Sequence, residues 1–283
     1  MMNEKTLIYR FENELSIAEI IKRPSAKCKT PYVADIRIIK ENNEYEDETM
    51  GHTPALGCCG LTDKNSIVCV SKKINPKKCS HTVELSILKE RGYDIVIGCN
   101  PKMAENLFEY CLRMNLIENL SHVEEYKREK TFLNSRFDFW GRDKNNCEFI
   151  CEIKNVPLAS YEDIPEKEYK KKDYSDRNVN TKIAYFPDGY RKKKNDVVSP
   201  RALKHIEELE KIKLEKGNDI RCIISFVIQR NDINSFQASN LDPIYKKAFK
   251  KAINNGVEVI PIIVEWTKTG EAYFINRDIP VFL

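Results

Sequence analysis

The feature that most constrains this chain is a change of pattern close to residue 100. Up to Gly98, short β-rich segments are separated by turn residues, and no long helical pattern interrupts them. The expected strands cover residues 15–23, 32–39, 67–72, 82–88 and 93–97. Such a run of short strands without a crossover helix favours a small barrel or sandwich, and the OB-type barrel is one candidate that commonly binds oligonucleotides. A fold alone does not establish that function.

After this region the periodicity becomes helical. Leu107 and Cys111 recur at helical spacing and predict a helix across residues 102–120 that links two units. Farther along, we expect strands at 136–140, 147–156, 220–229 and 257–265, and helices at 201–214 and 243–254. This alternation predicts a sheet with crossover helices. The prediction is a mixed α/β protein with an N-terminal β-rich domain of barrel or sandwich type, including the linking helix, at residues 1–118 and an α/β domain at 119–283.

Composition limits the class of protein. The 47 Lys and Arg residues exceed the 43 Asp and Glu residues by only four, so attraction for nucleic acid must depend on local charge. The opening sequence MMNEKTLIYR is charged and lacks the apolar stretch of a signal peptide, and no apolar run approaches the roughly 20 residues that span a bilayer. We expect an intracellular, cytoplasmic protein without a membrane partner.

The ten cysteines lack zinc-site spacing and are expected to be reduced and mostly buried. His81 and His205 are expected to make structural hydrogen bonds.

The most informative stretch is SRFDFWGRDKNNCEFICEIKN, residues 135–155. Two β-type runs flank the turn-forming sequence GRDKNN, which predicts a hairpin. Glu152 and Lys154 are two residues apart on the second strand, so they point to one face of the sheet. Asp138, on the first strand, can face the same side. The hairpin thus gathers two carboxylates and an ammonium group at one place.

These groups suit metal-assisted hydrolysis of a phosphodiester. Two carboxylates can hold Mg²⁺, or Mn²⁺, and leave coordination positions for water and a phosphate. The metal acidifies the water and stabilises the charge of the transition state, and Lys154 would orient that water. This is the Asp…Glu-x-Lys arrangement of PD-(D/E)XK nucleases. As a bare pattern it is weak, because Glu-x-Lys is also a common exposed charge pair on a strand.

Several ordered motifs resemble the sugar fermentation stimulation protein A (SfsA) family. The motifs are KKCSHTVEL (77–85), SRFDF (135–139), CEIKNVPLA (151–159), YFPD (185–188), RALKHIEEL (201–209), and FVIQRND (226–232) with LDPIYKKAFKKAINNGVEVI (241–260). The resemblance implies an OB-type domain followed by a PD-(D/E)XK nuclease-like α/β domain. It also implies a DNA-binding protein with a Mg²⁺-dependent, endonuclease-like phosphodiesterase site.

The same resemblance assigns individual residues. Asp138 and Glu152 are similar to the family's metal ligands, and Lys154 to its catalytic lysine. Glu129, in YKREK, is similar to a helix carboxylate that also reaches the metal. Gln229, at the end of a strong strand, is similar to the polar residue that often completes such catalytic sites.

Basic residues outside this group are candidates for contact with the nucleic-acid backbone. Those we single out are Arg136, Lys192, Lys193, Lys194, Arg201 and Lys204. Residues 161–181 and 191–199 look like basic insertions relative to the family, and such loops either grip a phosphate backbone or are simply solvated.

The first hypothesis is therefore a nuclease acting on DNA, and RNA is not excluded. The alternative is a non-catalytic DNA-binding regulatory protein with a vestigial nuclease site. A homodimer is an option that the sequence leaves open.

Overall fold

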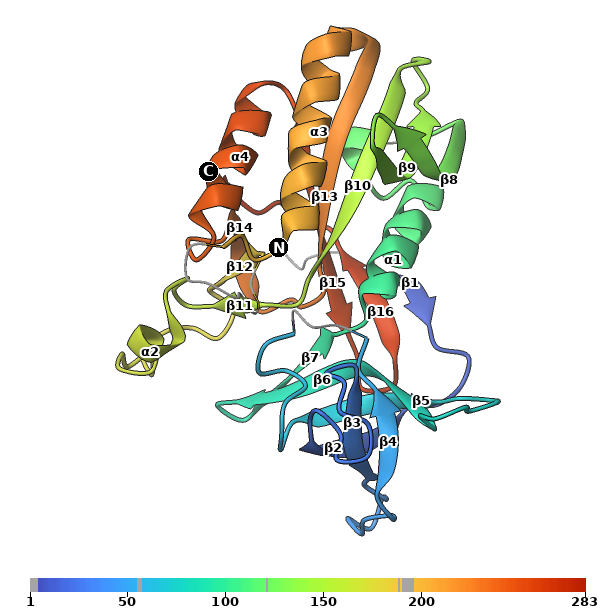
Figure 1. Ribbon diagram of the computed structural model, residues 1–283, viewed down its shortest axis with the longest axis vertical. Helices are drawn as coiled ribbons and strands as arrows, with labels where there is room; N and C mark the ends of the chain where they lie inside the picture. Colours follow the sequence, from blue (N-terminus) through green and yellow to red (C-terminus); the bar gives the residue numbers. More distant parts are fainter. Residues whose placement is uncertain (1–4, 55–57, 121, 188, 190–195) are drawn as a thin grey trace.

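Three β-sheets organise the chain in the computed structural model, which describes residues 5–54, 58–120, 122–187, 189 and 196–283. Figure 1 shows the six-stranded sheet of the N-terminal half at one end of the molecule and the larger seven-stranded sheet above it. No helix in the described ranges is long and apolar enough to cross a membrane. The mixed α/β class expected from the sequence is confirmed.

The six-stranded sheet has the order β4-β3-β2-β5-β6-β7, and β4 also pairs with β6. The second pairing curls the sheet around an aliphatic core that includes Ile20, Ile36 and Val68. Alternate residues of each strand supply this core, as the period of two predicts. Its strands are β2 (Ser16–Lys22), β3 (Val33–Ile38), β4 (Thr49–His52), β5 (Ile67–Lys72), β6 (His81–Glu90) and β7 (Tyr93–Gly98).

The seven-stranded sheet has the order β1-β16-β15-β13-β10-β9-β8, with β10, β13 and β15 parallel at its centre. Central parallel strands are covered on both faces, which explains the almost continuous apolar sequence of β13. The strands are β1 (Lys5–Arg10), β8 (Glu125–Phe132), β9 (Ser135–Arg142), β10 (Glu148–Val156), β13 (Ile220–Ile228), β15 (Glu258–Trp266) and β16 (Glu271–Ile275).

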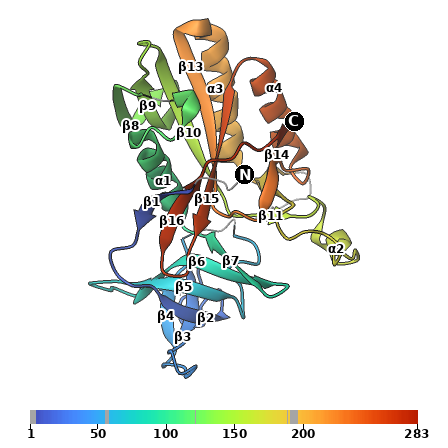
Figure 2. The ribbon, with the colours of Figure 1, turned by 180° about the vertical axis from the view of Figure 1, so that it is seen from behind.

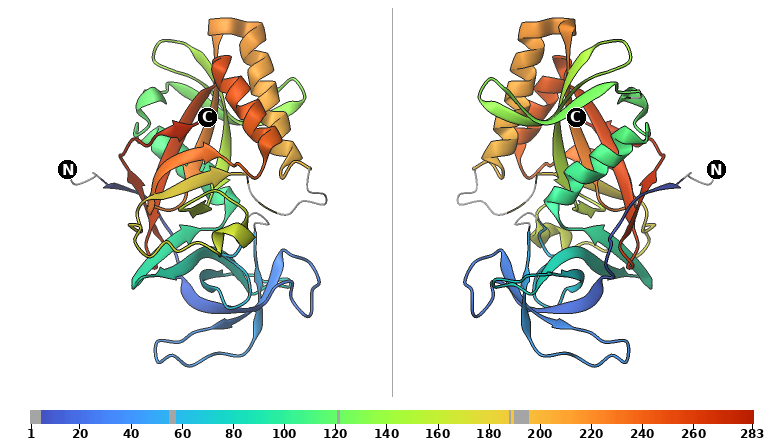
Figure 3. Two further views of the ribbon diagram at one scale, coloured as in Figure 1. Left: turned by 90° about the vertical axis from the view of Figure 1, so that its left-hand side faces the viewer. Right: turned by 90° about the vertical axis from the view of Figure 1, so that its right-hand side faces the viewer.

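Three helices cover this sheet. Helix α1 (Pro101–Arg113) lies on one face, and α3 (Pro200–Lys216) and α4 (Pro243–Asn254) lie together on the other (Figure 3). Each helix begins in the same way. Its N-cap residue, Asn100, Ser199 or Asp242, accepts a backbone N–H, and a proline follows at the first helical position.

Two segments from the expected N-terminal unit contribute to the large sheet. Strand β1 pairs antiparallel with β16 (Figure 2), and α1 buries Leu107, Phe108 and Cys111 against the sheet. The predicted helix also ends early, at Arg113, and a short 3₁₀ turn (Glu118–Leu120) follows. The core under α1 continues into the six-stranded sheet through β5 and β6, so the two sheets share one hydrophobic interior.

A small third sheet extends from the side of α4. It contains β11 (Ala159–Ser160), β12 (Lys182–Phe186), β14 (Ile233–Ala238) and β17 (Val281–Phe282), while α2 (Glu166–Tyr169) lies between β11 and β12 and a 3₁₀ turn (Gly217–Asp219) precedes β13. The expected insertion, 161–181, is thus an ordered arm. It holds six acidic and five basic residues, so it is not basic overall. Asp163 fixes its base by accepting hydrogen bonds from Gln237 and the Asn240 backbone at 2.8 and 2.6 Å.

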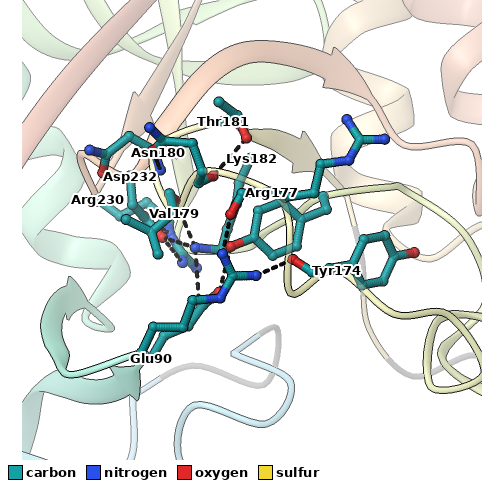
Figure 4. Close-up of polar contacts among 12 residues, drawn as sticks. Glu90, Tyr174, Arg177, Val179, Asn180, Thr181, Lys182, Arg230 and Asp232 are labelled. Carbon is teal, nitrogen blue, oxygen red and sulfur yellow. Dashed lines mark hydrogen bonds and ion pairs between the residues drawn. The ribbon is translucent and has the colours of Figure 1, made fainter.

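A buried group of charges, which we call the anchoring cluster, fastens this arm. It consists of Lys182, Asp232, Arg230 and Glu90 (Figure 4). Lys182 Nζ lies 2.7 Å from Asp232 Oδ2 and 2.9 Å from Glu90 Oε2, and Arg230 donates to both oxygens of Asp232. Because Glu90 belongs to β6, the cluster ties the arm to the six-stranded sheet.

Candidate active site

Strands β9 and β10 form the predicted hairpin, but their pairing stops part-way. The register runs from Glu148 opposite Arg142 to Cys151 opposite Phe139. Beyond that point Asp138 Oδ2 accepts the Ile153 N–H at 2.7 Å, so a carboxylate takes the place of the next backbone partner. The pairing of β9 with β10 ends there, just before Glu152 and Lys154.

Glu152 is the centre of the group. Its carboxylate is 2% exposed, and its Oε1 atom contacts both Lys154 Nζ, at 2.5 Å, and His205 Nδ1 from helix α3. Its Oε2 atom is buried and has no hydrogen-bond partner among the described residues. A buried carboxylate oxygen without a partner is costly, and a bound cation or ordered water would satisfy it.

The pKa values of the two carboxylates are shifted in opposite directions. Burial, followed by the charge of Glu152, raises the pKa of Asp138 to about 7. Burial also acts to raise the pKa of Glu152, but Lys154 and His205 outweigh it and lower that pKa. Glu152 is therefore ionised near neutral pH, whereas Asp138 is poised between its two protonation states. A cation between them would favour ionisation of both.

These residues fit a hard divalent cation. Asp138 and Glu152 offer carboxylate oxygens, and the unsatisfied Oε2 atom of Glu152 is a ready ligand. In the part of the chain that the structure describes, no group of three or more His, Cys, Asp or Glu side chains is arranged to hold a metal. A cation held by these two carboxylates would keep positions for water and for a phosphate, as Mg²⁺ commonly does.

Comparison with known proteins places the chain in a family. Residues 102–270 match the family described as "Sugar fermentation stimulation protein RE domain". The chain belongs to the SfsA family. A sugar fermentation stimulation protein homolog of Bartonella henselae is 26% identical over 254 residues, covering 89% of this chain and 90% of the homolog. Another, from Brucella anthropi, is 30% identical over 202 residues, covering 70% and 72%. The SfsA resemblance noted in the sequence is thus confirmed.

A solved SfsA structure has the same fold. The Pyrococcus furiosus SfsA, described in complex with Ca²⁺, superposes with a TM-score of 0.73 at 18% identity, covering 98% of this chain and 100% of that one. At this identity the likeness establishes the SfsA fold, and the roles of individual residues depend on the geometry of this chain.

Glu129 does not lie where the SfsA resemblance implied. It belongs to strand β8, so its expected place on a helix is wrong. Its backbone has a positive φ of 59°, its side chain is 58% exposed, and it pairs with Arg136 at 3.3 Å. A helix carboxylate whose charge does reach Asp138 is Glu105 on α1. After burial and Glu152, the charge of Glu105 also raises the pKa of Asp138.

Glu105 was missed although the helix that carries it was predicted. In strand β8, Arg128 reaches across to α1 and pairs with Glu105 at 2.7 Å, so Glu105 joins the hairpin to the helix. The signal available in the sequence was an acidic residue on the predicted helix that precedes the hairpin.

Gln229 also lies outside the group around Glu152. It is fully buried just after β13, donates to Asn155 Oδ1 and accepts from Trp266 Nε1 at 3.0 Å. Asn155 follows Lys154 on β10, and neighbouring strand residues face opposite sides. Gln229 therefore lies on the other face of the sheet. It meets Gly98 there, where an added Cβ would come within 1.8 Å of its Oε1 atom.

The basic residues predicted to contact nucleic acid lie in different places, and only some of them are among the described residues. Lys204, on α3, donates to the Asn134 carbonyl at 2.7 Å and so stands at the rim of the β8–β9 hairpin. Arg136, at the start of β9, is 61% exposed beside Glu129, and Arg201 is exposed in the first turn of α3. Lys192, Lys193 and Lys194 lie outside the described residues.

Proposed function

We propose that this SfsA-family protein is a divalent-metal-dependent phosphodiesterase that cleaves DNA, with Mg²⁺ or Mn²⁺ as its cofactor. The observation that carries the proposal is the buried Glu152 carboxylate, whose Oε2 atom lacks a partner, beside Asp138 and Lys154. The Pyrococcus furiosus SfsA, described in complex with Ca²⁺, supports a divalent cation as the metal.

Each side chain has a separate task in this proposal. Asp138 and Glu152 would hold the cation, which when bound polarises the phosphodiester and acidifies a water molecule. Lys154 Nζ, 2.5 Å from Glu152 Oε1, brings a positive charge and hydrogen-bond donors to the attacking water or the phosphate. His205 holds Glu152 from the side of α3. Arg136, Arg201 and Lys204 would contact the phosphate backbone near the site.

The test is an endonuclease assay on purified protein with linear double-stranded and single-stranded DNA in Mg²⁺ or Mn²⁺. Asp138→Asn and Glu152→Gln preserve side-chain shape and should abolish cleavage. Glu129→Gln is the matched control, because that exposed carboxylate pairs with Arg136 and should be dispensable. Cleavage that survives both Asp138→Asn and Glu152→Gln would come from a contaminant and would rule out the site.

The alternative of a DNA-binding regulatory protein with a vestigial site has its own signature. Wild type would then never cut, while its affinity for DNA would fall steeply with salt. Cleavage of RNA in the same assay would change the assigned substrate but not the residues, because this chemistry does not itself distinguish the two polymers. A homodimer, and backbone contact by Lys192, Lys193 and Lys194, stay predictions.

A further inference from the structure

Tyr245 carries a buried hydroxyl without a partner, in the core between the large sheet and helices α3 and α4. It lies in the first turn of α4, where its N–H donates to the cap residue Asp242 at 3.0 Å. The side chain is 0% exposed, and its ring packs edge-on against Phe186 with centroids 5.5 Å apart. Its hydroxyl has no hydrogen-bond partner among the described residues. Tyrosine hydroxyls usually find a partner when they are buried.

Glu152 Oε2 is another buried atom without a hydrogen-bond partner among the described residues. Glu152 faces α3, as its contact with His205 demonstrates, and α3 packs beside α4 over the same face of the sheet. A series of aromatic rings leads from β13, beside Lys154, to Tyr245. Phe226, which is in register with Lys154, contacts Phe186 at 5.7 Å, and Phe186 contacts Tyr245.

The pKa of Tyr245 also indicates that Glu152 is its neighbour. Burial, then the charge of Glu152 and then that of Asp242, raise the pKa of Tyr245 well above its usual value. Both oxygens of Asp242 already accept backbone N–H groups, from Tyr245 and from Val198. Glu152 has the free oxygen, so it is the carboxylate that needs the hydroxyl.

We propose that Tyr245 is a positioning residue for Glu152, donating a hydrogen bond to its Oε2 atom through one water molecule. Glu152 Oε1 is already engaged by Lys154 and His205, and Oε2 has two lone pairs, one for a metal and one for this donor. The hydroxyl would fix the carboxylate before a cation arrives. The metal-binding role of Glu152 rests on the function proposed above, whereas the hydrogen bond itself does not.

A metal-free measurement tests the hydrogen bond. Urea unfolding in EDTA compares Tyr245→Phe in the wild-type background and in Glu152→Ala. If the hydroxyl serves Glu152, Tyr245→Phe should lower the folding equilibrium constant about tenfold or more in wild type, but not when Glu152 is absent. An equal effect in both backgrounds, or a stabilisation in both, would overturn the proposal.

A second measurement tests the consequence for metal. Calorimetric titration with Ca²⁺ alone should give a Kd about 10–100-fold weaker for Tyr245→Phe than for wild type. Tyr126→Phe is the matched control, since its hydroxyl bonds Glu109 at 2.9 Å and should leave the Kd unchanged. An unchanged Kd in Tyr245→Phe contradicts the positioning role. Wild type that binds no Ca²⁺ contradicts the proposed function, while the unfolding experiment still decides the hydrogen bond.

Discussion

The anchoring cluster and the candidate site are both buried groups of charges, but only one of them is complete. In the anchoring cluster, each oxygen of Glu90 and Asp232 accepts at least one donor, from Tyr161, Lys182 or Arg230. Although burial alone would raise them, the pKa values of Glu90 and Asp232 are both lowered by these partners. The cluster is internally satisfied and needs no ligand.

The candidate site also combines carboxylates with basic side chains, but these side chains do not satisfy all of its buried oxygens. Glu152 keeps a buried oxygen without a partner, and burial beside Glu152 raises the pKa of Asp138 to about 7. Charges that a fold leaves unsatisfied weaken the empty protein, and they persist where a ligand completes them. The comparison teaches that the fold itself satisfies the buried charges of the anchoring cluster, whereas it leaves a carboxylate oxygen of Glu152 for a ligand.

The largest effect should follow from breaking the complete cluster. Lys182→Met leaves the buried Asp232 and the partly buried Glu90 with one cation fewer, and the free energy of unfolding should fall by about 3–5 kcal/mol. Urea unfolding measures this loss. Lys154→Met is the comparison, and it should cost less because His205 still contacts Glu152. A larger loss for Lys154→Met would contradict the distinction between the two groups.

Asp138→Asn should stabilise the protein, in contrast to Lys182→Met, which should destabilise it. Folding raises the pKa of Asp138, through burial and then Glu152, from its ordinary 3.8 to about 7. An acid with a raised pKa stabilises the fold below its ordinary pKa, and that contribution is lost as pH rises through the folded value. The amide mimics the protonated acid and keeps an oxygen for the Ile153 N–H. The metal-free variant should therefore be about 2–4 kcal/mol more stable than wild type at pH 8.

This stability gain should vanish near pH 4, so urea unfolding at both pH values in EDTA measures it. The same variant should lose about 10²-fold or more of any DNA cleavage. Asp232→Asn provides the contrast, because the pKa of Asp232 is lowered and its contribution is present above the ordinary value and lost only as pH falls. An Asp138→Asn protein less stable than wild type at pH 8 would mean that the carboxylate is structural.

The sequence predicted those parts of the site that depend on local pattern. A period of two places Glu152 and Lys154 on one face of β10, and the turn after β9 brings Asp138 alongside. Contacts between distant segments were not accessible in the same way. Strand β1 joins β16 across most of the chain, and no local period signals that pairing.

Resemblance without geometry also misplaced two residues. The SfsA resemblance assigned Glu129 to a helix, but pairing of its neighbours with β9 holds it in strand β8. Gln229 ends the strand next to β10, but alternation sends its contacts to the face opposite Lys154. The anchoring cluster was missed entirely, since Glu90, Lys182 and Asp232 come from three separate elements and meet only in the folded chain.

The smallest effect concerns the exposed cations at the rim of the candidate site. Lys204, with a side chain 51% exposed, and Arg136, 61% exposed, should each contact one phosphate if DNA approaches this face. Lys204→Ala and Arg136→Ala should then each reduce the slope of log affinity against log salt by about 1. Lys268→Ala is the matched control, because that lysine is similarly exposed, at 49%, but its ion-pair partner is Asp94 of β7 in the six-stranded sheet. Equal slopes for Lys204→Ala and Lys268→Ala would mean that the rim cations are solvated only, and that the incomplete site receives its substrate from another direction.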